Sequence, residues 1–356
     1  MKGETIEAVM IVKNEEEVLA RCLDSINGID KITILDTGST DKTAEIAEAH
    51  GATIHVGKYK WKDNFASARN EALKYATCDW ILIIDADEVL VGQEHQPVKA
   101  KKGRPNKEPA PIVSPGIVAL RLAVESVPKE EFGLRFRCFS AGGLDEHIII
   151  RAHRRHPNIE WRGAIHNYLS YQNGPVVPGL ALVYGHSPAH NGDPERAFRI
   201  LSREVALHPE KPRETYYLAR EYYTRREVEN AKSLYERYLK LSNYPPEAAD
   251  AHLMLARCAL ALGSAEGAWS HVFSALRINA DLSEAYHLLA ALSGPINRGH
   301  WKRNAAAAND TLALFVRKVD GGDMVMTECS AGASGAVAVS APLEIEHDAS
   351  AATEAL

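Results

Sequence analysis

Hydrophobic positions in the first ninety residues fall into short continuous runs separated by stretches with helical spacing. The runs have the length of buried strands and lie at residues 6–12 (IEAVMIV), 32–35, 52–56 and 80–84 (WILII). The stretches between them predict helices at residues 15–26, 41–50 and 64–75. This regular alternation of strand and helix predicts a doubly wound, mostly parallel sheet with helices on both faces.

The pattern changes after the fourth predicted strand. Residues 92–116 contain five prolines and five basic residues, which predict an exposed, flexible insertion. Five further apolar segments predict strands that complete the sheet and build one wall of a pocket, at residues 117–127, 134–139, 148–152, 164–169 and 180–184. We therefore expect residues 1–190 to form one α/β domain.

From residue 193 onward the pattern is helical and repetitive. The pair Leu218-Ala219 recurs 37 residues later as Leu255-Ala256, and Leu289-Ala290 begins a third unit. A helix-turn-helix period of this length resembles the tetratricopeptide repeat, in which each unit buries its apolar face against its neighbours. The C-terminal half is therefore expected to be all-α.

We expect this tetratricopeptide-like domain to occupy residues 191–320 and to close with a helix at 298–319. The turn glycine typical of such repeats is Gly263 in the second unit, whereas Arg226 stands at that position in the first. Residues 321–356 are rich in Ala and Ser and contain six acidic residues but no Lys or Arg. This composition predicts a disordered acidic tail.

The tail carries the whole net charge of −6, so residues 1–320 are formally neutral. A neutral body argues against a nucleic-acid-binding protein that works through its overall charge. The basic run at residues 101–105 (KKGRP) resembles a hook for the minor groove of A·T-rich DNA, but a solvated basic loop is the simpler interpretation. Nucleic acid is therefore not the expected partner.

The five cysteines are scattered and show no metal-ligand or disulfide spacing, which favours free thiols in a reducing compartment. No apolar stretch approaches the roughly 18–20 residues of a membrane span. The apolar run near the N-terminus is too short for a signal peptide. We expect a soluble, cytoplasmic protein.

Two carboxylates one residue apart, Asp85 and Asp87, directly follow the apolar run at 80–84, and Glu88 comes next. Delivering acidic groups from a buried strand is costly unless a cation lies beside them. A hard divalent cation, bound by these carboxylates and by the oxygens of a diphosphate, meets that need. Taken alone, the pattern is also compatible with a solvated turn whose acid caps a helix.

Further polar residues follow the first two predicted strands. Asn14 and Glu15 stand after the first strand, and Asp36 ends the second, two residues before Gly38. Ligands of doubly wound folds bind at the carboxyl ends of the strands, where Asp36 is placed to accept hydrogen bonds from a nucleobase or ribose. Gly38 permits a tight turn and the close approach of a ligand. An Asx-turn with a helix cap is the alternative.

Four motifs in this order resemble the family 2 glycosyltransferases of GT-A fold: VMIVKNEE, DTGSTDKT, NFASARNEAL and WILIIDADE. The resemblance is specific over residues 6–90, extends to about residue 190, and is one of architecture for the helices. It implies an inverting transfer from a nucleotide-diphosphate sugar, with a UDP-sugar favoured. It also implies Mn²⁺ or Mg²⁺ as the cofactor.

The resemblance also implies roles for the residues at matching positions. Asn14, Glu15 and Asp36 would hold the nucleoside. Asp85 would contact the ribose or metal-bound water, and Asp87 would bind the metal and the diphosphate.

The third motif contributes Arg69 and Asn70. Our interpretation is that one of them braces the nucleotide loop or the sugar hydroxyls. A surface ion pair on an amphipathic helix explains Arg69 equally well.

Members of the family often carry the segment W-x-G-x-x-H-E, which in this chain is WRGAIHN, so that Asn167 replaces the Glu. His166 would complete the metal site beside Asp85 and Asp87, with a hydrogen-bonded strand histidine as the alternative. Trp161 would stack on a sugar face, although a buried indole is equally compatible.

An inverting displacement needs a general base near the acceptor hydroxyl and electrostatic help for the departing diphosphate. The metal, together with Arg151, Arg154 or Arg155, would supply that help. The candidate bases are Asp145 and Glu146, which we place first from their position in the chain, and Glu88.

Concave repeat surfaces bind peptides and proteins, so we expect the helical repeats to contact a macromolecular acceptor, in the first place a protein. A lipid-linked, polysaccharide or DNA acceptor is the alternative within the same reaction. The alternative from another class is a non-catalytic scaffold that binds nucleotide-sugars. The amide of Asn167 in place of a carboxylate favours that second class.

Overall fold

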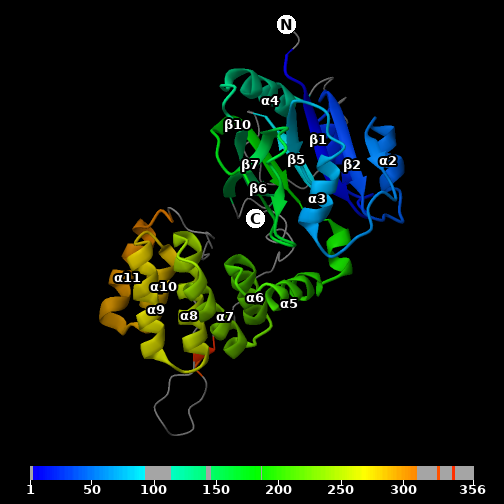
Figure 1. Cartoon of the computed structure of the whole chain (residues 1–356). Helices are drawn as coiled ribbons and strands as arrows, with labels where there is room; N and C mark the ends of the chain where they lie inside the picture. The colour runs from blue at the N-terminus through cyan, green and yellow to red at the C-terminus, as the bar shows by residue number, and fades with distance from the viewer. Residues whose placement is uncertain are drawn as a thin grey trace, which may run out of the picture. The chain divides into compact units, whose positions relative to one another are not determined.

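The computed structural model describes residues 3–92, 114–141, 146–185, 187–310, 327–328 and 339–340. It contains two compact units (Figure 1). The first unit runs to Arg196 and the second begins at Ala197, six residues beyond the boundary expected at 190. Each unit is described by itself below.

The first unit is built on one eight-stranded sheet. Its strands are β1 (Ile6–Val12), β2 (Lys31–Asp36), β3 (Thr53–His55), β4 (Trp80–Ile83), β5 (Glu88–Val91), β6 (Gly133–Ser140), β7 (Glu146–Arg154) and β10 (Val176–Tyr184). They lie in the order β3-β2-β1-β4-β7-β6-β10-β5. Strands β1 to β4 pair in parallel, β7 is antiparallel to both β4 and β6, and β5 is antiparallel to β10. The sheet is therefore mostly parallel, as the sequence predicts.

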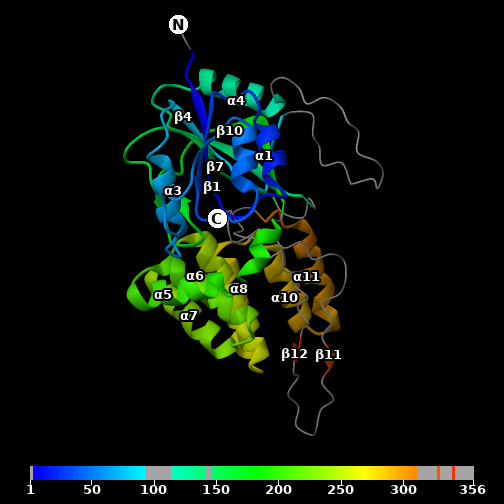
Figure 2. The ribbon, with the colours of Figure 1, turned by 90° about the vertical axis from the view of Figure 1, so that its right-hand side faces the viewer.

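Helices cover both faces of this sheet (Figure 2). They are α1 (Leu19–Ser25), α2 (Thr43–Ala49), α3 (Phe65–Leu73) and α4 (Pro115–Ser126). Alternate residues of β1 face opposite sides, so Ala8 and Met10 pack in the core that α1, α2 and α4 cover. Val9 packs on the other side, in the cluster that α3 covers. Because both faces are buried, these strands read as continuous apolar runs.

Two secondary-structure predictions are wrong, and one strand was missed. Residues 117–127 form helix α4, because Ile117, Leu120 and Val124 are buried at helical spacing while Val118 and Leu122 stay exposed. Residues 164–169 form mainly a turn, within a separate hairpin of β8 (Trp161–Arg162) and β9 (Tyr168–Leu169). Strand β5 was not predicted, because it is four residues long and directly follows the turn that carries Asp85 and Asp87, called the acidic turn below.

The predicted insertion at 92–116 lies mostly outside the described residues, and its last two residues, Pro115 and Gly116, begin α4. A short 3₁₀ helix, η1 (Pro188–Gly192), follows β10. None of the helices in the described part of the chain is long and apolar enough to cross a bilayer.

The second unit consists of antiparallel helices. They are α5 (Arg196–Leu207), α6 (Pro212–Thr224), α7 (Val228–Leu241), α8 (Pro245–Ala261), α9 (Ala265–Ile278), α10 (Ser283–Leu292) and α11 (Pro295–Ala307). Pairs α6–α7, α8–α9 and α10–α11 pack against each other, as a helix-turn-helix repeat requires. The closing helix is α11, which begins three residues before the predicted 298. It ends at Ala307, and the described residues 308–310 are not helical, so the prediction of an unbroken helix to 319 is wrong.

The turns of the first two repeats share one backbone conformation. Arg226 has a φ of 61° and Gly263 a φ of 79°, both in the left-handed region. In both turns the next residue donates its main-chain amide back into the preceding helix, Glu227 to Tyr222 and Ser264 to Ala259. Arg226 therefore adopts the conformation that glycine takes in the second repeat. Within the predicted tail, the structure describes only β11 (Thr327–Glu328) and β12 (Val339–Ser340), which pair antiparallel.

Candidate active site

The polar residues singled out in the sequence lie at one edge of the sheet. Strands β2, β1 and β4 are neighbours and run parallel, so their carboxyl ends meet there. Asp36 is the last residue of β2, and Asp85 follows the end of β4 by two positions. Two strand spacings, about 10 Å, therefore separate the strands that carry these acids.

The loops after β1 and β2 are tied together by side chains. Asp36, which is 3% exposed, accepts hydrogen bonds at Oδ1 from the main-chain amides of Gly38 (2.9 Å) and Ser39 (2.8 Å). Asn14 Oδ1 accepts a hydrogen bond from the main-chain amide of Thr40 (2.8 Å), and the main-chain amide of Asn14 donates to Ser39 Oγ (3.0 Å). The Asx-turn considered from the sequence is therefore present. It leaves Oδ2 of Asp36 outside these two hydrogen bonds.

Glu15, in the loop after β1, contacts the segment that follows β10. Its main-chain amide donates to Thr43 Oγ1 (2.7 Å). Ser187, just after β10, donates its hydroxyl to Glu15 Oε2 at 2.5 Å. Both residues are buried. The Glu15 carboxylate thus fixes the segment after β10 against the loop after β1.

Asp85 is held by two arginines that come from distant parts of the chain. Arg69 of α3 places Nη2 at 2.8 Å from Asp85 Oδ1, and Arg151 of β7 places Nη1 at 4.0 Å from Oδ2. Arg69 is only 5% exposed, so this is a buried ion pair rather than the surface pair considered from the sequence. The main-chain carbonyl of Asp85 accepts from Cys22 Sγ (3.2 Å), which holds the turn against α1.

Glu88, a candidate base, is engaged on both carboxylate oxygens. Arg151 donates to Oε1 (2.7 Å) and Oε2 (3.3 Å), and the main-chain amide of Asp85 donates to Oε2 (2.8 Å). Burial raises the pKa of Glu88 above its ordinary value against the opposing effect of Arg151. Burial alone would lower the pKa of Arg151, but the Glu88 carboxylate raises it, so the guanidinium stays charged. This geometry suits a carboxylate that fixes the turn.

Asp87 is fixed through its main chain. Its carbonyl accepts from the amide of Gly185 (3.1 Å) and from Arg21 Nη2 (3.3 Å). Among the described residues, no group of three or more His, Cys, Asp or Glu side chains could hold a metal ion. Asp85 and Asp87 supply two hard oxygen ligands, which fit Mg²⁺ or Mn²⁺ when diphosphate oxygens provide others. The assignment of His166 to such a site stays a prediction.

Asn70 and Trp161 contact each other. The Asn70 side chain donates to the main-chain oxygen of Trp161 (2.9 Å) and accepts from its amide (2.8 Å). The Trp161 ring lies 4.7 Å from Cζ of Arg69. His166 and Asn167 lie in the turn of the same hairpin and are both buried. Asn167 Oδ1 has no hydrogen-bond partner among the described residues.

Two of the three candidate bases are not tested by the structure. Asp145 lies outside the described residues, and of Glu146 only its place as the first residue of β7 is described. The amino end of β7 lies at the same sheet edge as Asp85, since β7 runs antiparallel to β4. Both bases stay predictions.

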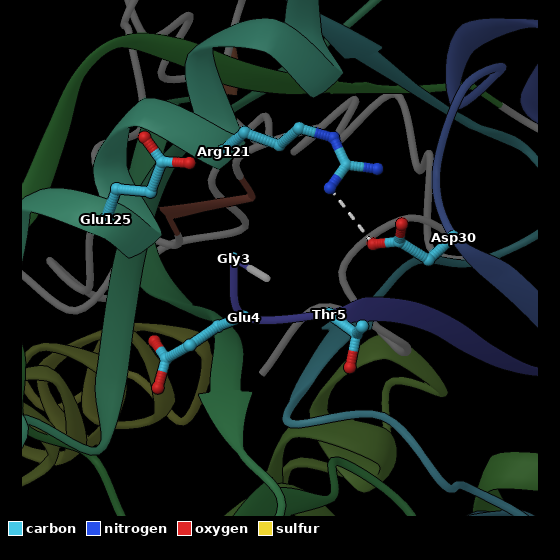
Figure 3. Close-up of a pocket in the computed structure, with 6 residues that line it drawn as sticks. All are labelled: Gly3, Glu4, Thr5, Asp30, Arg121 and Glu125. Carbon is cyan, nitrogen blue, oxygen red and sulfur yellow. Dashed lines mark hydrogen bonds and ion pairs between the residues drawn. The ribbon is translucent and has the colours of Figure 1, made fainter. Parts of the chain in front are cut away.

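A cavity of about 250 Å³ lies at the opposite edge of the sheet (Figure 3). It is lined by Gly3, Glu4, Thr5, Asp30, Arg121 and Glu125. Arg121 reaches across it to Asp30 at 3.0 Å. Since Gly3 and Asp30 precede β1 and β2, the cavity is at the amino ends of the strands and contains none of the candidate site residues.

The sequence of the first unit matches a known family. The model of "Glycosyl transferase family 2" matches residues 7–101, which carry Asp36, Asp85 and Asp87. Residues 7–101 of the first unit therefore resemble a family 2 glycosyltransferase domain. The mostly parallel sheet and the helical C-terminal half expected from the sequence are both present.

Two relatives match different shares of the chain. A TPR repeat-containing protein of Synechococcus elongatus is 41% identical over 102 residues, which are 28% of this chain and 25% of the relative. The SPbeta prophage-derived glycosyltransferase SunS of Bacillus subtilis is 28% identical over 61% of this chain and 49% of its own length. The chain thus spans between a quarter and a half of the length of these relatives.

Glucosyl-3-phosphoglycerate synthase from Mycobacterium tuberculosis, in a complex with Mn²⁺, UDP and glucosyl-3-phosphoglycerate, is a similar solved structure. It is 22% identical, with coverage of 40% of this chain and 46% of that chain, and a TM-score of 0.28. At that TM-score the family assignment rests on the sequence matches alone.

The sequence did not identify the partners of the acidic turn. Arg151 was expected to face the diphosphate, yet its guanidinium is bound to Glu88. Cys22, Arg21 and Ser187 were not singled out at all. Cys22 follows the helical spacing of α1's buried face, which hid its contact with Asp85 behind an ordinary core position.

Proposed function

We propose that this protein is a metal-dependent, inverting glycosyltransferase that moves a sugar from a nucleotide-diphosphate sugar, with UDP-sugars favoured, to a macromolecular acceptor. The observation that carries the proposal is the position of Asp36, Asp85 and Asp87 at the carboxyl ends of neighbouring parallel strands, within the segment that matches the family. Doubly wound sheets bind nucleotides at this edge.

Each part of the site has a role in this proposal. Asp36, with one carboxylate oxygen committed to the turn, would accept hydrogen bonds from the nucleoside, and Asn14 and Glu15 would shape the loop beside it. Asp87 and Asp85 would hold Mn²⁺ or Mg²⁺. When bound, this cation would neutralise charge on the departing diphosphate.

The transfer itself needs one proton acceptor. The acceptor oxygen would form a bond to the anomeric carbon while the bond from that carbon to the diphosphate breaks, leaving both electrons on the diphosphate. The acceptor proton would pass to a carboxylate, for which Asp145 or Glu146 is proposed. Glu88 is the weaker candidate, because Arg151 and the Asp85 amide occupy its oxygens. The amide of Asn167 cannot act as a base.

Donor hydrolysis tests the first half of the proposal. Purified protein with Mn²⁺ should slowly release UDP or GDP from one member of a panel of sugar nucleotides. EDTA or Asp87→Asn should abolish release. Asp24→Asn, on the exposed side of α1, should leave it unchanged. Metal-dependent nucleotide-sugar binding without turnover on any acceptor would support the scaffold alternative, which the Asn167 amide favours.

We propose a protein as the acceptor, contacted by the helical repeats. Stacked helical pairs of the α6–α11 type present the extended surfaces on which peptides bind. Mass spectrometry of proteins co-expressed with this chain should show additions of hexose size that disappear with Asp87→Asn. Modified lipid or polysaccharide, with no modified protein, would reject a protein acceptor.

A further inference from the structure

The β8–β9 hairpin is attached to helix α3 by three hydrogen bonds. Two join the side chain of Asn70 to the main chain of Trp161, and the third runs from the amide of Phe65 to the carbonyl of Ala164 (2.8 Å). Strand β8 pairs with β9 in a two-stranded sheet of their own. The side-chain amide of Asn70 therefore pairs with the main chain of β8 as the peptide group of an adjacent strand would.

The hairpin places an aromatic ring on the arginine that holds Asp85. The Trp161 ring lies 4.7 Å from Cζ of Arg69, and Nη2 of Arg69 lies 2.8 Å from Asp85 Oδ1. A guanidinium over an indole is attracted to the ring face, and more strongly where water is excluded. Arg69 is 5% exposed and its Nε has no hydrogen-bond partner in the described structure, so the indole and Asp85 restrain its position.

The space beside these two side chains is too small for a substrate. Arg69 and Trp161 line a cavity of about 10 Å³ together with apolar residues of α3, β1 and β4. One water molecule fills a cavity of that size. On that side, therefore, neither side chain can reach a nucleotide or a sugar, and their contacts are with the protein.

The turn of the same hairpin carries two further buried polar residues, His166 and Asn167. Residues 163–167 connect β8 to β9, with positive φ at Gly163 (87°) and His166 (48°). Asn167 is 4% exposed, and its Oδ1 has no hydrogen-bond partner among the described residues. A displacement of the hairpin would therefore move this turn and would also remove the Trp161 ring from Arg69.

We propose that Asn70 is a positioning residue that fastens the β8–β9 hairpin to α3 and, through Trp161 and Arg69, orients Asp85 for the donor. The sequence suggested that Arg69 or Asn70 braces the nucleotide loop or the sugar hydroxyls, whereas this proposal places Asn70 behind Arg69. The inference rests on the proposed function for its effect on donor binding. The attachment of the hairpin itself does not depend on that function.

The test compares two substitutions in one helix. Asn70→Ala removes the two hydrogen bonds to Trp161. Asn64→Ala removes the N-cap of α3, where Asn64 Oδ1 accepts from Ser67 N (2.8 Å), and serves as the control for a destabilised helix. Asn70→Asp keeps the size of the side chain and the acceptor but replaces the donor to the Trp161 carbonyl with a carboxylate oxygen.

Binding of UDP with Mn²⁺, followed by calorimetry, is the first readout. Loss of a group that orients a ligand typically weakens metal binding or activity by about 10–100-fold. We expect such a weakening for Asn70→Ala and Asn70→Asp and less than about twofold for Asn64→Ala, since the Asn64 side chain accepts from Ser67 of the same helix. In donor hydrolysis, the Asn70 variants should raise KM more than they lower kcat.

Hydrogen exchange without any ligand is the second readout. The amides of 161–169 should exchange faster in Asn70→Ala than in the native protein, while those of β1 stay unchanged. Unchanged exchange in the hairpin, or equal UDP affinities for Asn70→Ala and Asn64→Ala, would overturn the inference. If the native protein binds no nucleotide but the hairpin exchange rises as expected, the proposed function fails and the attachment of the hairpin stands.

Discussion

Arg151 donates from its guanidinium to both carboxylate oxygens of Glu88, at 2.7 and 3.3 Å, although the two residues are 63 positions apart. Both side chains are buried, with exposed fractions of 2% for Glu88 and 3% for Arg151. Glu88 in turn accepts from the amide of Asp85, so this ion pair fixes the backbone of the acidic turn. It joins β7 to the start of β5, the strand that follows the candidate metal ligands Asp85 and Asp87 in the chain.

Removing one partner of this pair should be costly. Arg151→Met leaves the Glu88 carboxylate buried without its counter-charge, and we expect a loss of about 3–5 kcal/mol in the free energy of unfolding by urea. Arg162→Met, which breaks a pair with Glu160 at two exposed side chains, should change it by less than about 0.5 kcal/mol. Equal effects of the two substitutions would show that Glu88 does not depend on Arg151.

A second prediction concerns His153, which is 1% exposed. Burial lowers the pKa of His153 from its ordinary value to about 4, and only the hydrogen bond to the Arg154 carbonyl opposes this. In the unfolded chain the ring takes up a proton near pH 6.5, so protons favour unfolding as the pH falls below that value. At pH 5.5 this histidine should cost about 1 kcal/mol relative to pH 7.5.

Urea unfolding of the native protein and of His153→Gln at both pH values measures this effect. The native protein should lose about 1 kcal/mol more than the variant between pH 7.5 and 5.5. His208→Gln, at an exposed position of the second unit, is the control and should keep the native pH dependence. A variant with the same pH dependence as the native protein would contradict the prediction.

A third prediction tests the turns of the helical repeats. Arg226 occupies a left-handed conformation that costs a non-glycine residue about 1 kcal/mol. Arg226→Gly should therefore leave stability unchanged or raise it by up to about 1 kcal/mol, although glycine also gains freedom in the unfolded chain. Gly263→Ala at the matching turn should lower stability by about 1 kcal/mol. The melting temperatures of the two variants should move apart, and a lower value for Arg226→Gly than for Gly263→Ala would refute the shared turn.

A fourth prediction separates the charge of Asp36 from its structural role. Asp36→Asn keeps the oxygen that accepts from Gly38 and Ser39, so the turn and the stability should be retained within about 1 kcal/mol. The lost charge should weaken UDP binding about tenfold, since hydrogen bonds to charged groups contribute about 1.5–3 kcal/mol. Calorimetric titration with UDP measures this. Affinity equal to that of the native protein would place the nucleoside elsewhere.

The local sequence already contained most of the first unit's architecture. Runs such as IEAVMIV are apolar on both faces, which is compatible only with strands buried between two layers of helices, and β1 forms with the predicted bounds. Because parallel strands end at one edge, the sequence alone predicts that the acids after these runs lie together. The helical repeat followed from spacing as well, including the turn at Arg226.

Tertiary structure decided what each of those acids touches. The ion pairs of Asp85 with Arg69 and of Glu88 with Arg151, and the attachment of Trp161 to Asn70, join segments far apart in the chain. Nothing in the spacing along the chain encodes such pairings, because they arise only when helices and strands pack. The same holds for residues 117–127, whose apolar content fits a strand or a helix. Burial of Ile117, Leu120 and Val124 against the sheet selected the helix.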